Sequence, residues 1–193
     1  MKLAILISAK GSKVRYLIDK IKNKEIDFLE ITHVIADRPA YGLGIAQKEG
    51  IFSSSIPPKE FSTHLHKLLI GKVDLILLAG FLSILDQGFC KLWNKKIINI
   101  HPSLLPKYGG RGMYGMHVHK CVIENKEKYS GATIHYVNKE IDGGDIIVQK
   151  SYLIKKEETP LSLSKEIEAI ENTLLVDVLK KIHDNLLINK KLL

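Results

Sequence analysis

The sequence predicts an α/β fold: a Rossmann-like, doubly wound and mostly parallel sheet with helices on both faces. Two observations favour it. Short apolar runs alternate with amphipathic segments through the first hundred residues, and this alternation is typical of parallel sheets. The run at 73–81 is almost continuously apolar, as expected of a strand covered on both faces. An antiparallel strand pair near the C-terminal part and a long C-terminal helix complete the predicted fold.

The first half of the chain alternates strand and helix. Its strands are short aliphatic runs such as "LAILIS" and "ITHVIAD", and its helices are segments whose apolar residues recur every three or four positions. In chain order we expect a strand at 3–8, a helix at 11–23, a strand at 31–37, a helix at 42–49, a short strand at 51–56, a helix at 59–70, a strand at 73–81, a helix at 86–94 and a strand at 96–101.

The second half begins with a Gly-rich loop and then changes pattern. "MHVHKCVIEN" at 116–125 has the spacing of a helix. "GATIHYVN" at 131–138 and "GDIIVQKSYLI" at 144–154 are β-rich runs separated by a Gly-containing turn, which predicts a strand pair. An amphipathic segment from 161 to about 187 predicts the long helix.

Length and composition indicate a single domain, 1–193, in the cytoplasm. A chain of 193 residues suits one domain with a sizeable core. The two cysteines, Cys90 and Cys121, form neither a disulfide framework nor a zinc pattern, and they fit a reducing compartment. The apolar run at 3–7 is too short for a signal peptide, and no run approaches the ~20 residues of a membrane span.

The chain carries a formal net charge of +8. A basic protein attracts anions such as phosphorylated metabolites, polyglutamyl tails or nucleic acid. The lysines are scattered, with small clusters at 155–156, 180–181 and 190–191. Scattered lysines are typical of a solvated surface, so small anionic partners are favoured over nucleic acid and membranes.

Residues that could bind a ligand or catalyse a reaction lie where the predicted strands end. Parallel sheets bind their ligands at these strand ends. The segment 8–13, "SAKGSK", joins a strand to a helix; it is either an ordinary helix start or an anion site, and it lacks the dinucleotide and Walker patterns. Asn99 and His101 are one residue apart on a strand that Pro102 ends, so they project to the same side. An Asn amide can stabilise an oxyanion and a His can transfer a proton, although a buried structural histidine remains the alternative.

Asp142 lies in "EIDGGD", between the two strands of the predicted pair. Asp-Gly is a strong turn signal, so a hairpin turn is one interpretation. The other is a carboxylate held against a histidine, which favours the imidazolium form.

A metal site is disfavoured. The residues that raise the question are His117, His119, Cys121 and His135. His117 and His119 are two apart, which separates them on a helix, and no H-E-x-x-H or C-x-x-C pattern occurs.

In combination, these segments resemble a known family. The stretches that carry the resemblance are "ISAKGSKV" (7–14), "LAGFLSIL" (78–85), "NIHPSLLPKYGGRG" (99–112), "GATIHYV" (131–137) and "IDGGDI" (141–146). Their order and context are similar to those of the folate-dependent formyltransferases, and most of all to the glycinamide ribonucleotide transformylase family. The resemblance covers nearly the whole chain. Asn-x-His-Pro-Ser-Leu-Leu-Pro with a downstream Asp-Gly-Gly is highly specific to that superfamily.

The resemblance implies an enzyme of purine biosynthesis that moves the formyl group of 10-formyltetrahydrofolate, a co-substrate, to the amine of glycinamide ribonucleotide. It implies direct transfer without a metal. Asn99 would hydrogen-bond the formyl oxygen, His101 would act as an imidazolium that stabilises charge and moves protons, and Asp142 would hold His101 in its charged form.

The resemblance also implies the binding residues. Gly11, Ser12 and Lys13 would hold the substrate phosphate, and Glu171 would meet the ribose or glycinamide side. Residues 1–100 would form the phosphate-binding half, and 101–193 the folate-binding and catalytic half. The folate-binding residues would be Leu82, Ser83, Ile84, Leu85, Asn99, Asn138, Glu140 and Asp142.

Three positions depart from the family pattern. Lys13 stands where the family usually has Asn, and Ser83 stands where a basic residue is common. The loop 108–119 is longer than in the commonest members.

Two alternatives remain open. One is a formyltransferase for another amine, such as methionyl-tRNA or a nucleotide sugar; those relatives commonly carry an additional C-terminal domain, for which this chain leaves no room. The other is a non-catalytic phosphate- or nucleic-acid-binding module, favoured only by the net charge. We expect small-molecule substrates and a monomer or homodimer.

Overall fold

The computed structural model describes residues 1–191. Its elements follow the predicted order closely, with one addition: a short 3-10 helix, η1, begins at Pro58 and precedes α3. Proline suits this place because a first helical residue needs no N–H partner. The elements are β1 (Lys2–Ile7), α1 (Ser12–Lys22), β2 (Glu30–Ala36), α2 (Tyr41–Lys48), β3 (Phe52–Ser55), η1 (Pro58–Glu60), α3 (Phe61–Leu69), β4 (Leu75–Leu78), α4 (Gln87–Leu92), β5 (Ile97–His101), α5 (Met116–Glu124), β6 (Tyr129–Tyr136), β7 (Ile146–Leu153) and α6 (Pro160–Lys191).

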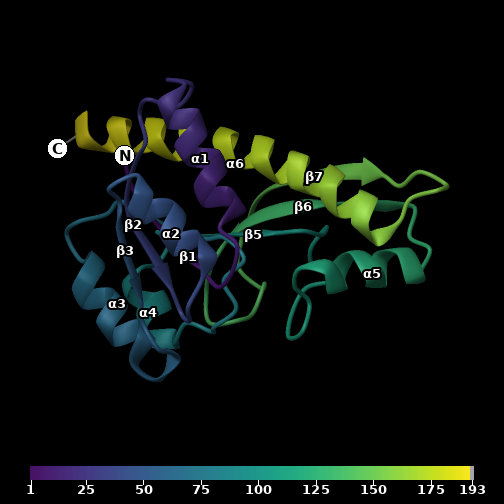
Figure 1. The fold of residues 1–193 in the computed structure, drawn as a ribbon, viewed down its shortest axis with the longest axis horizontal. Coiled ribbons are helices and arrows are strands. Elements are labelled where there is room, and N and C mark those ends of the chain that lie inside the picture. Colours follow the sequence, from purple (N-terminus) through teal and green to yellow (C-terminus); the bar gives the residue numbers. More distant parts are fainter. Residues whose placement is uncertain (192–193) are drawn as a thin grey trace.

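The strands form one seven-stranded sheet in the order β3-β2-β1-β4-β5-β6-β7 (Figure 1). Neighbouring strands from β3 to β5 are parallel, whereas β6 is antiparallel to both β5 and β7. This confirms the predicted mixed, mostly parallel sheet. The strand order reverses between β1 and β4, and such a switch point leaves a crevice at the carboxyl ends of the strands.

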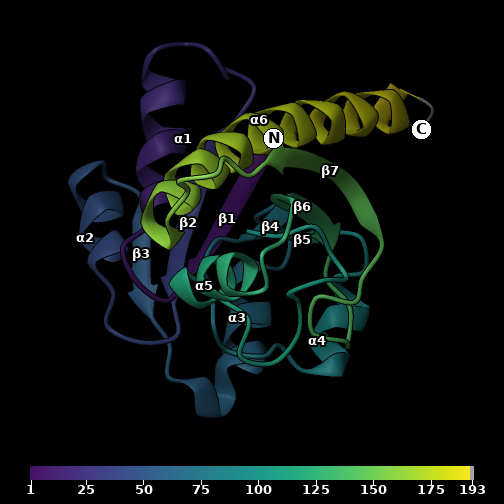
Figure 2. The same ribbon diagram turned by 90° about the vertical axis from the view of Figure 1, so that its right-hand side faces the viewer.

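The sheet is covered on both faces, as predicted. Side chains of β1 alternate between two buried clusters: Leu3 and Ile5 join one cluster, whereas Ala4 and Leu6 join the other. The first cluster lies under α1, α2, α5 and α6, and the second lies under α3 and α4. Figures 1 and 2 show α1 and α6 on one side of the sheet and α3 and α4 on the other. Both faces of the central strands are therefore buried, which accounts for their continuous apolar runs.

The last helix, α6, is 32 residues long and crosses the sheet from the β7 side toward α1. It packs against β5, β6, β7 and α5. Its buried residues Leu163, Ile167, Leu174 and Val178 are separated by four, seven and four residues, as expected of one face of a helix. Within residues 1–191, none of the helices combines the length and the apolar character that spanning a bilayer requires.

The loop after β1 depends on a close approach of two glycines. Gly11 adopts a left-handed backbone conformation (φ +73°) at the start of α1, and a Cβ on it would lie 2.6 Å from the Cα of Gly42 in α2. A Cβ on Gly42 would lie 2.8 Å from the Cα of Gly11 and 2.5 Å from the side chain of Ile7. Both positions therefore need glycine, because backbone occupies the space that a methyl group would take.

We predict opposite effects for two neighbouring glycines of α2. Gly42→Ala should lower the free energy of unfolding by roughly 1–3 kcal/mol, because the methyl group overpacks the contact with Gly11. A methyl group on Gly44 would meet no atom within 4 Å, so Gly44→Ala should raise stability by up to about 1 kcal/mol through helix propensity. Urea unfolding of both variants checks this, and equal effects would show that the glycine contact does not constrain the loop.

Candidate active site

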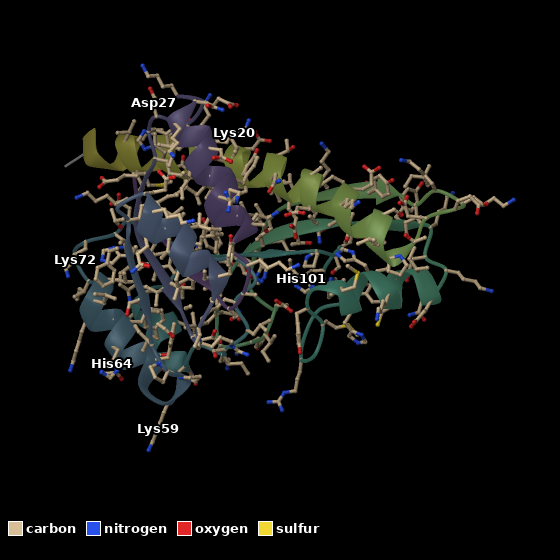
Figure 3. All side chains as sticks on the ribbon, in the orientation of Figure 1. Lys20, Asp27, Lys59, His64, Lys72 and His101 are labelled. Carbon is tan, nitrogen blue, oxygen red and sulfur yellow. The ribbon has the colours of Figure 1, made fainter. Side chains whose placement is uncertain are left out.

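A cleft of about 720 Å³ lies at the carboxyl ends of β1, β4 and β5. Its walls come from the loops after these strands, from the loop before α5 and from one side of α6. A smaller hollow of about 110 Å³ adjoins it and shares Asn99 and Asp142 with it. Figure 3 shows His101 inside the molecule between the sheet and α5, whereas Lys59 and Lys72 lie at the periphery.

The structure places every residue that the sequence analysis assigned to substrate binding or catalysis in the cleft or in the adjoining hollow. The larger cleft contains the proposed phosphate, catalytic and ribose-side residues: Gly11, Ser12, Lys13, Asn99, His101, Asp142 and Glu171. The smaller hollow contains the proposed folate residues: Leu82, Ser83, Ile84, Leu85, Asn99, Asn138, Glu140 and Asp142. The cleft and the hollow adjoin, so all of these residues lie in one region of the molecule. Their individual roles stay predictions.

Asn99 and His101 project from the same side of β5, as alternation along a strand requires. The Asn99 amide Nδ2 lies 3.0 Å from His135 Nε2 and 3.3 Å from Asp142 Oδ1. His135 faces Asn99 because the two residues are register partners in the β5–β6 ladder. Its Nδ1 lies 2.8 Å from the carbonyl oxygen of Tyr136. A carbonyl only accepts, so Nδ1 donates there, and in neutral His135 the Nε2 accepts from Asn99.

His101 is buried and its ring is oriented from both ends. Its Nε2 donates to the carbonyl oxygen of Tyr108 at 2.8 Å, and its Nδ1 lies 3.6 Å from Asp142 Oδ2. The second contact is an ion pair when the imidazole is protonated. His119, also buried, lines the same cleft, and burial together with the charge of His101 lowers its pKa. A neutral His119 therefore stands beside a histidine that has a carboxylate partner.

Asp142 is both a turn residue and a carboxylate that faces a histidine, so both interpretations drawn from the sequence apply. It has a left-handed backbone conformation (φ +55°), which Asp adopts more readily than most residues, and it stands in the turn between β6 and β7. Its carboxylate also accepts the N–H of Gly110 at 2.9 Å, besides the Asn99 amide. The turn therefore places a charged group against the end of β5.

The pKa of Asp142 is lowered from its ordinary value. Burial by itself raises the pKa, but the ring of His135 when its Nε2 is protonated, the charge of His101 and the N–H of Gly110 together outweigh it. The surroundings therefore favour the carboxylate over the neutral acid.

The loop after β1 presents the first turn of α1 to the cleft. Gly11, Ser12 and Lys13 form its start, and the first N–H groups of a helix lack partners within the helix. The side chain of Lys13 extends toward α6. Its Nζ lies 2.8 Å from Glu171 Oε2 and 2.8 Å from Asn172 Oδ1, both on that helix.

The segment 82–85 is held from behind by a buried carboxylate. Ser83 donates to Asp37 Oδ2 at 2.6 Å, and Arg38 makes a two-pronged contact with the same carboxylate at 3.0 and 2.8 Å. Leu82 N donates to Ser8 Oγ at 2.8 Å. Leu82 and Ile84 are exposed, so this segment offers its apolar side chains to the hollow while Ser83 anchors it.

The four residues that raised the metal question do not gather at one point. Cys121 lies 3.5 Å from Nε2 of His117 on the next turn of α5, whereas His119 faces the cleft and His135 lies on β6. Among residues 1–191, no group of three or more His, Cys, Asp or Glu side chains is placed to hold a metal ion.

The sequence analysis did not identify several groups that contact the predicted site residues. The sequence raised His135 only as a metal ligand, although it shares a strand face with Thr133 in "GATIHYV". Its pairing with Asn99 depends on the β5–β6 register, which the sequence does not state. Asp37 and Asn172 carry no motif, and the Tyr108 carbonyl and Gly110 N–H are backbone groups that no side-chain pattern can identify.

Comparison with known proteins agrees with the fold. Residues 1–179 match the family model described as formyl transferase. A phosphoribosylglycinamide formyltransferase of Anaplasma phagocytophilum has a solved structure with a TM-score of 0.85 and 35% identity, covering 95% of this chain and 87% of that one. The corresponding Coxiella burnetii structure gives a TM-score of 0.87 and 32% identity, covering 96% and 88%.

Curated relatives are longer than this chain. The chloroplastic phosphoribosylglycinamide formyltransferase of Arabidopsis thaliana is 34% identical over 92% of this chain, which spans 63% of that protein. The human trifunctional purine biosynthetic protein adenosine-3 is 33% identical over 89% of this chain, which spans 17% of that protein.

The family match over residues 1–179 shows that the chain belongs to the formyl transferase family, and the fold agrees with this. Within that family it is similar, over nearly its whole length, to phosphoribosylglycinamide formyltransferases.

Asp142→Asn should destabilise the protein at pH 7 by roughly 1–3 kcal/mol, the scale of hydrogen bonds to a charged group. Because the folded-state pKa of Asp142 is lowered, its contribution is present above the unfolded pKa of about 3.9 and is lost as pH falls through the folded pKa. The stability difference between the two proteins should therefore shrink below about pH 4. Urea unfolding from pH 7 to 3 measures it.

Asp145→Asn is the matched control, because Asp145 lies three residues away with an exposed side chain. It should leave stability at pH 7 nearly unchanged. A constant difference between wild type and Asp142→Asn down to pH 3 would show that the Asp142 charge does not contribute.

Proposed function

We propose that the chain is a phosphoribosylglycinamide formyltransferase, which transfers the formyl group of 10-formyltetrahydrofolate to the amine of N1-(5-phospho-D-ribosyl)glycinamide in purine biosynthesis. One observation carries the proposal: Asn99, His101 and Asp142 meet at the junction of a large cleft and a smaller hollow. The solved relatives of that name, which cover almost all of this chain, support it.

The two parts of the site suit two different ligands. A cleft of about 720 Å³ lies within the range of small-molecule sites. The first turn of α1, at Gly11–Lys13, offers main-chain N–H groups to the phosphate. The hollow offers the exposed apolar side chains of Leu82, Ile84 and Ile141, which suit the pterin ring of the folate.

10-Formyltetrahydrofolate supplies the formyl group when bound. The chain's own residues then act on the charge that develops at the formyl oxygen. Asn99 donates to that oxygen. Both of its amide hydrogens have acceptors in the structure, and the 3.3 Å contact with Asp142 is the longer of the two. We propose that Asn99 exchanges this longer bond for the formyl oxygen.

His101 handles the proton. The amine forms a C–N bond with the formyl carbon, the bond from that carbon to N10 breaks, and one proton passes from the amine to N10. Because Tyr108 holds Nε2 of His101, Nδ1 is the nitrogen available for this transfer, and Asp142 faces it. The carboxylate stabilises the imidazolium while it carries the proton.

We further propose a cytoplasmic enzyme with small-molecule partners only, working as a monomer or homodimer and without a metal. Cys90 and Cys121 are both unpaired, which fits a reducing compartment. We propose that the phosphate-binding half, 1–100, and the folate-binding and catalytic half, 101–193, act as one domain, because the central sheet joins strands from both. Residues 192–193 lie outside the described part.

The test is formation of formylglycinamide ribonucleotide by the purified protein from 10-formyltetrahydrofolate and glycinamide ribonucleotide. We expect turnover with this acceptor and none with methionyl-tRNA or a nucleotide sugar. Turnover with either of those acceptors in place of glycinamide ribonucleotide would overturn the assignment and favour the alternative acceptor.

His101→Ala and Asn99→Ala should each lower kcat/KM by roughly 10²-fold or more while the protein stays folded, the scale of a lost proton carrier or oxyanion donor. Asn94→Ala is the matched control, because Asn94 is exposed and lies outside the cleft. Near-wild-type turnover in either site variant would remove that residue from the mechanism.

A further inference from the structure

Lys13 has an unusual environment for a residue at the start of a helix that faces an anion site. Its side chain is only 7% exposed, and its Nζ lies between two side chains of α6. Glu171 Oε2 and Asn172 Oδ1 are each 2.8 Å away, and Glu168 Oε1 is 4.0 Å away. Two of the three ammonium donors therefore have close acceptors within the protein.

This arrangement disfavours Lys13 as the direct phosphate ligand. To turn toward an anion at the helix start, the ammonium would have to leave the Glu171 carboxylate, whose side chain is only 13% exposed. An unpaired buried carboxylate is costly, so the ion pair opposes that movement. The main-chain N–H groups of α1 do not have this conflict.

Glu171 gains a defined position from the same contact. Oε2 is bound to Lys13, whereas Oε1 has no hydrogen bond or ion pair within residues 1–191. Both Lys13 and Glu171 line the cleft. One carboxylate oxygen is thus held by the protein, and the other is left to accept hydrogen bonds from a ligand.

We propose that Lys13 is a positioning residue: its ammonium joins α1 to α6 and holds the Glu171 carboxylate at the cleft wall, in the orientation needed for the contact with the ribose or glycinamide side of the substrate that the family resemblance already assigns to Glu171. The inference rests on the proposed function, because it assigns a role within the binding of the ribonucleotide acceptor. Lys13 also offsets the charge of Glu171, so that an anionic substrate can lie beside that wall.

The experiment compares wild type, Glu171→Gln, Lys13→Met and the double variant in the formyl-transfer assay. Glu171→Gln should raise the KM for glycinamide ribonucleotide by roughly tenfold, the scale of a charge-assisted hydrogen bond. Lys13→Met should raise the same KM, with little change in the KM for 10-formyltetrahydrofolate. If Lys13 acts through Glu171, the double variant should stay within about twofold of Glu171→Gln.

Folding does not limit the test. Lys13→Met alone leaves a buried carboxylate unpaired, whereas the double variant removes both charges. The comparison of the double variant with Glu171→Gln is therefore sufficient if the single lysine variant does not fold. Lys22→Met is the control, because Lys22 lies on the same helix and pairs with Glu49 at 2.7 Å outside the cleft; it should leave all kinetic constants unchanged.

Two results would overturn the proposal. The first is a double variant whose KM for glycinamide ribonucleotide exceeds that of Glu171→Gln by more than about twofold, as expected of a direct phosphate ligand. The second is Glu171→Gln with an unchanged KM. A wild-type protein that forms no formylglycinamide ribonucleotide would instead refute the proposed function, so the two failures are distinguishable.

Discussion

The carboxylate of Asp142 accepts hydrogen bonds from Gly110 and Asn99 and lies 3.6 Å from Nδ1 of His101. Through these contacts it connects the β6–β7 turn, the loop before α5 and the end of β5. Because the carboxylate is largely buried, its charged form depends on these partners to offset the cost of burial. The positions of the three segments are therefore coupled, and the geometry of the site depends on one negative charge.

The same physical rule recurs on two other walls of the cleft. Lys13 and Glu171 pair α1 with α6, and Asp37 pairs with Arg38 and Ser83 behind the segment 82–85. In each case a buried charged group has a partner from a different segment of the chain: Glu171 for Lys13 and Ser83 for Asp37. Charges that are expensive to bury thus determine where the cleft walls lie relative to the sheet.

This view gives a common account of two departures from the family pattern. By the sequence resemblance, Lys13 and Ser83 stand where an amide and a basic side chain are expected. In this chain each has a partner within the protein: Lys13 contacts Glu171 and Asn172, and Ser83 donates to Asp37. Both residues therefore line the site and at the same time contact another segment of the chain.

By itself, the sequence determined the fold class, the order of the elements and the positions of Asn99, His101 and Asp142 at the ends of their segments. These features follow from local periodicity and turn chemistry, which depend only on residues close in the chain. The tertiary structure alone decided that His135 faces Asn99, that Tyr108 holds His101, and that Lys13 contacts Glu171 and Asn172 of α6. Those facts depend on the β5–β6 register, on backbone carbonyls and on a helix some 160 residues away, and a pattern in one segment carries no information about a partner that only folding brings near.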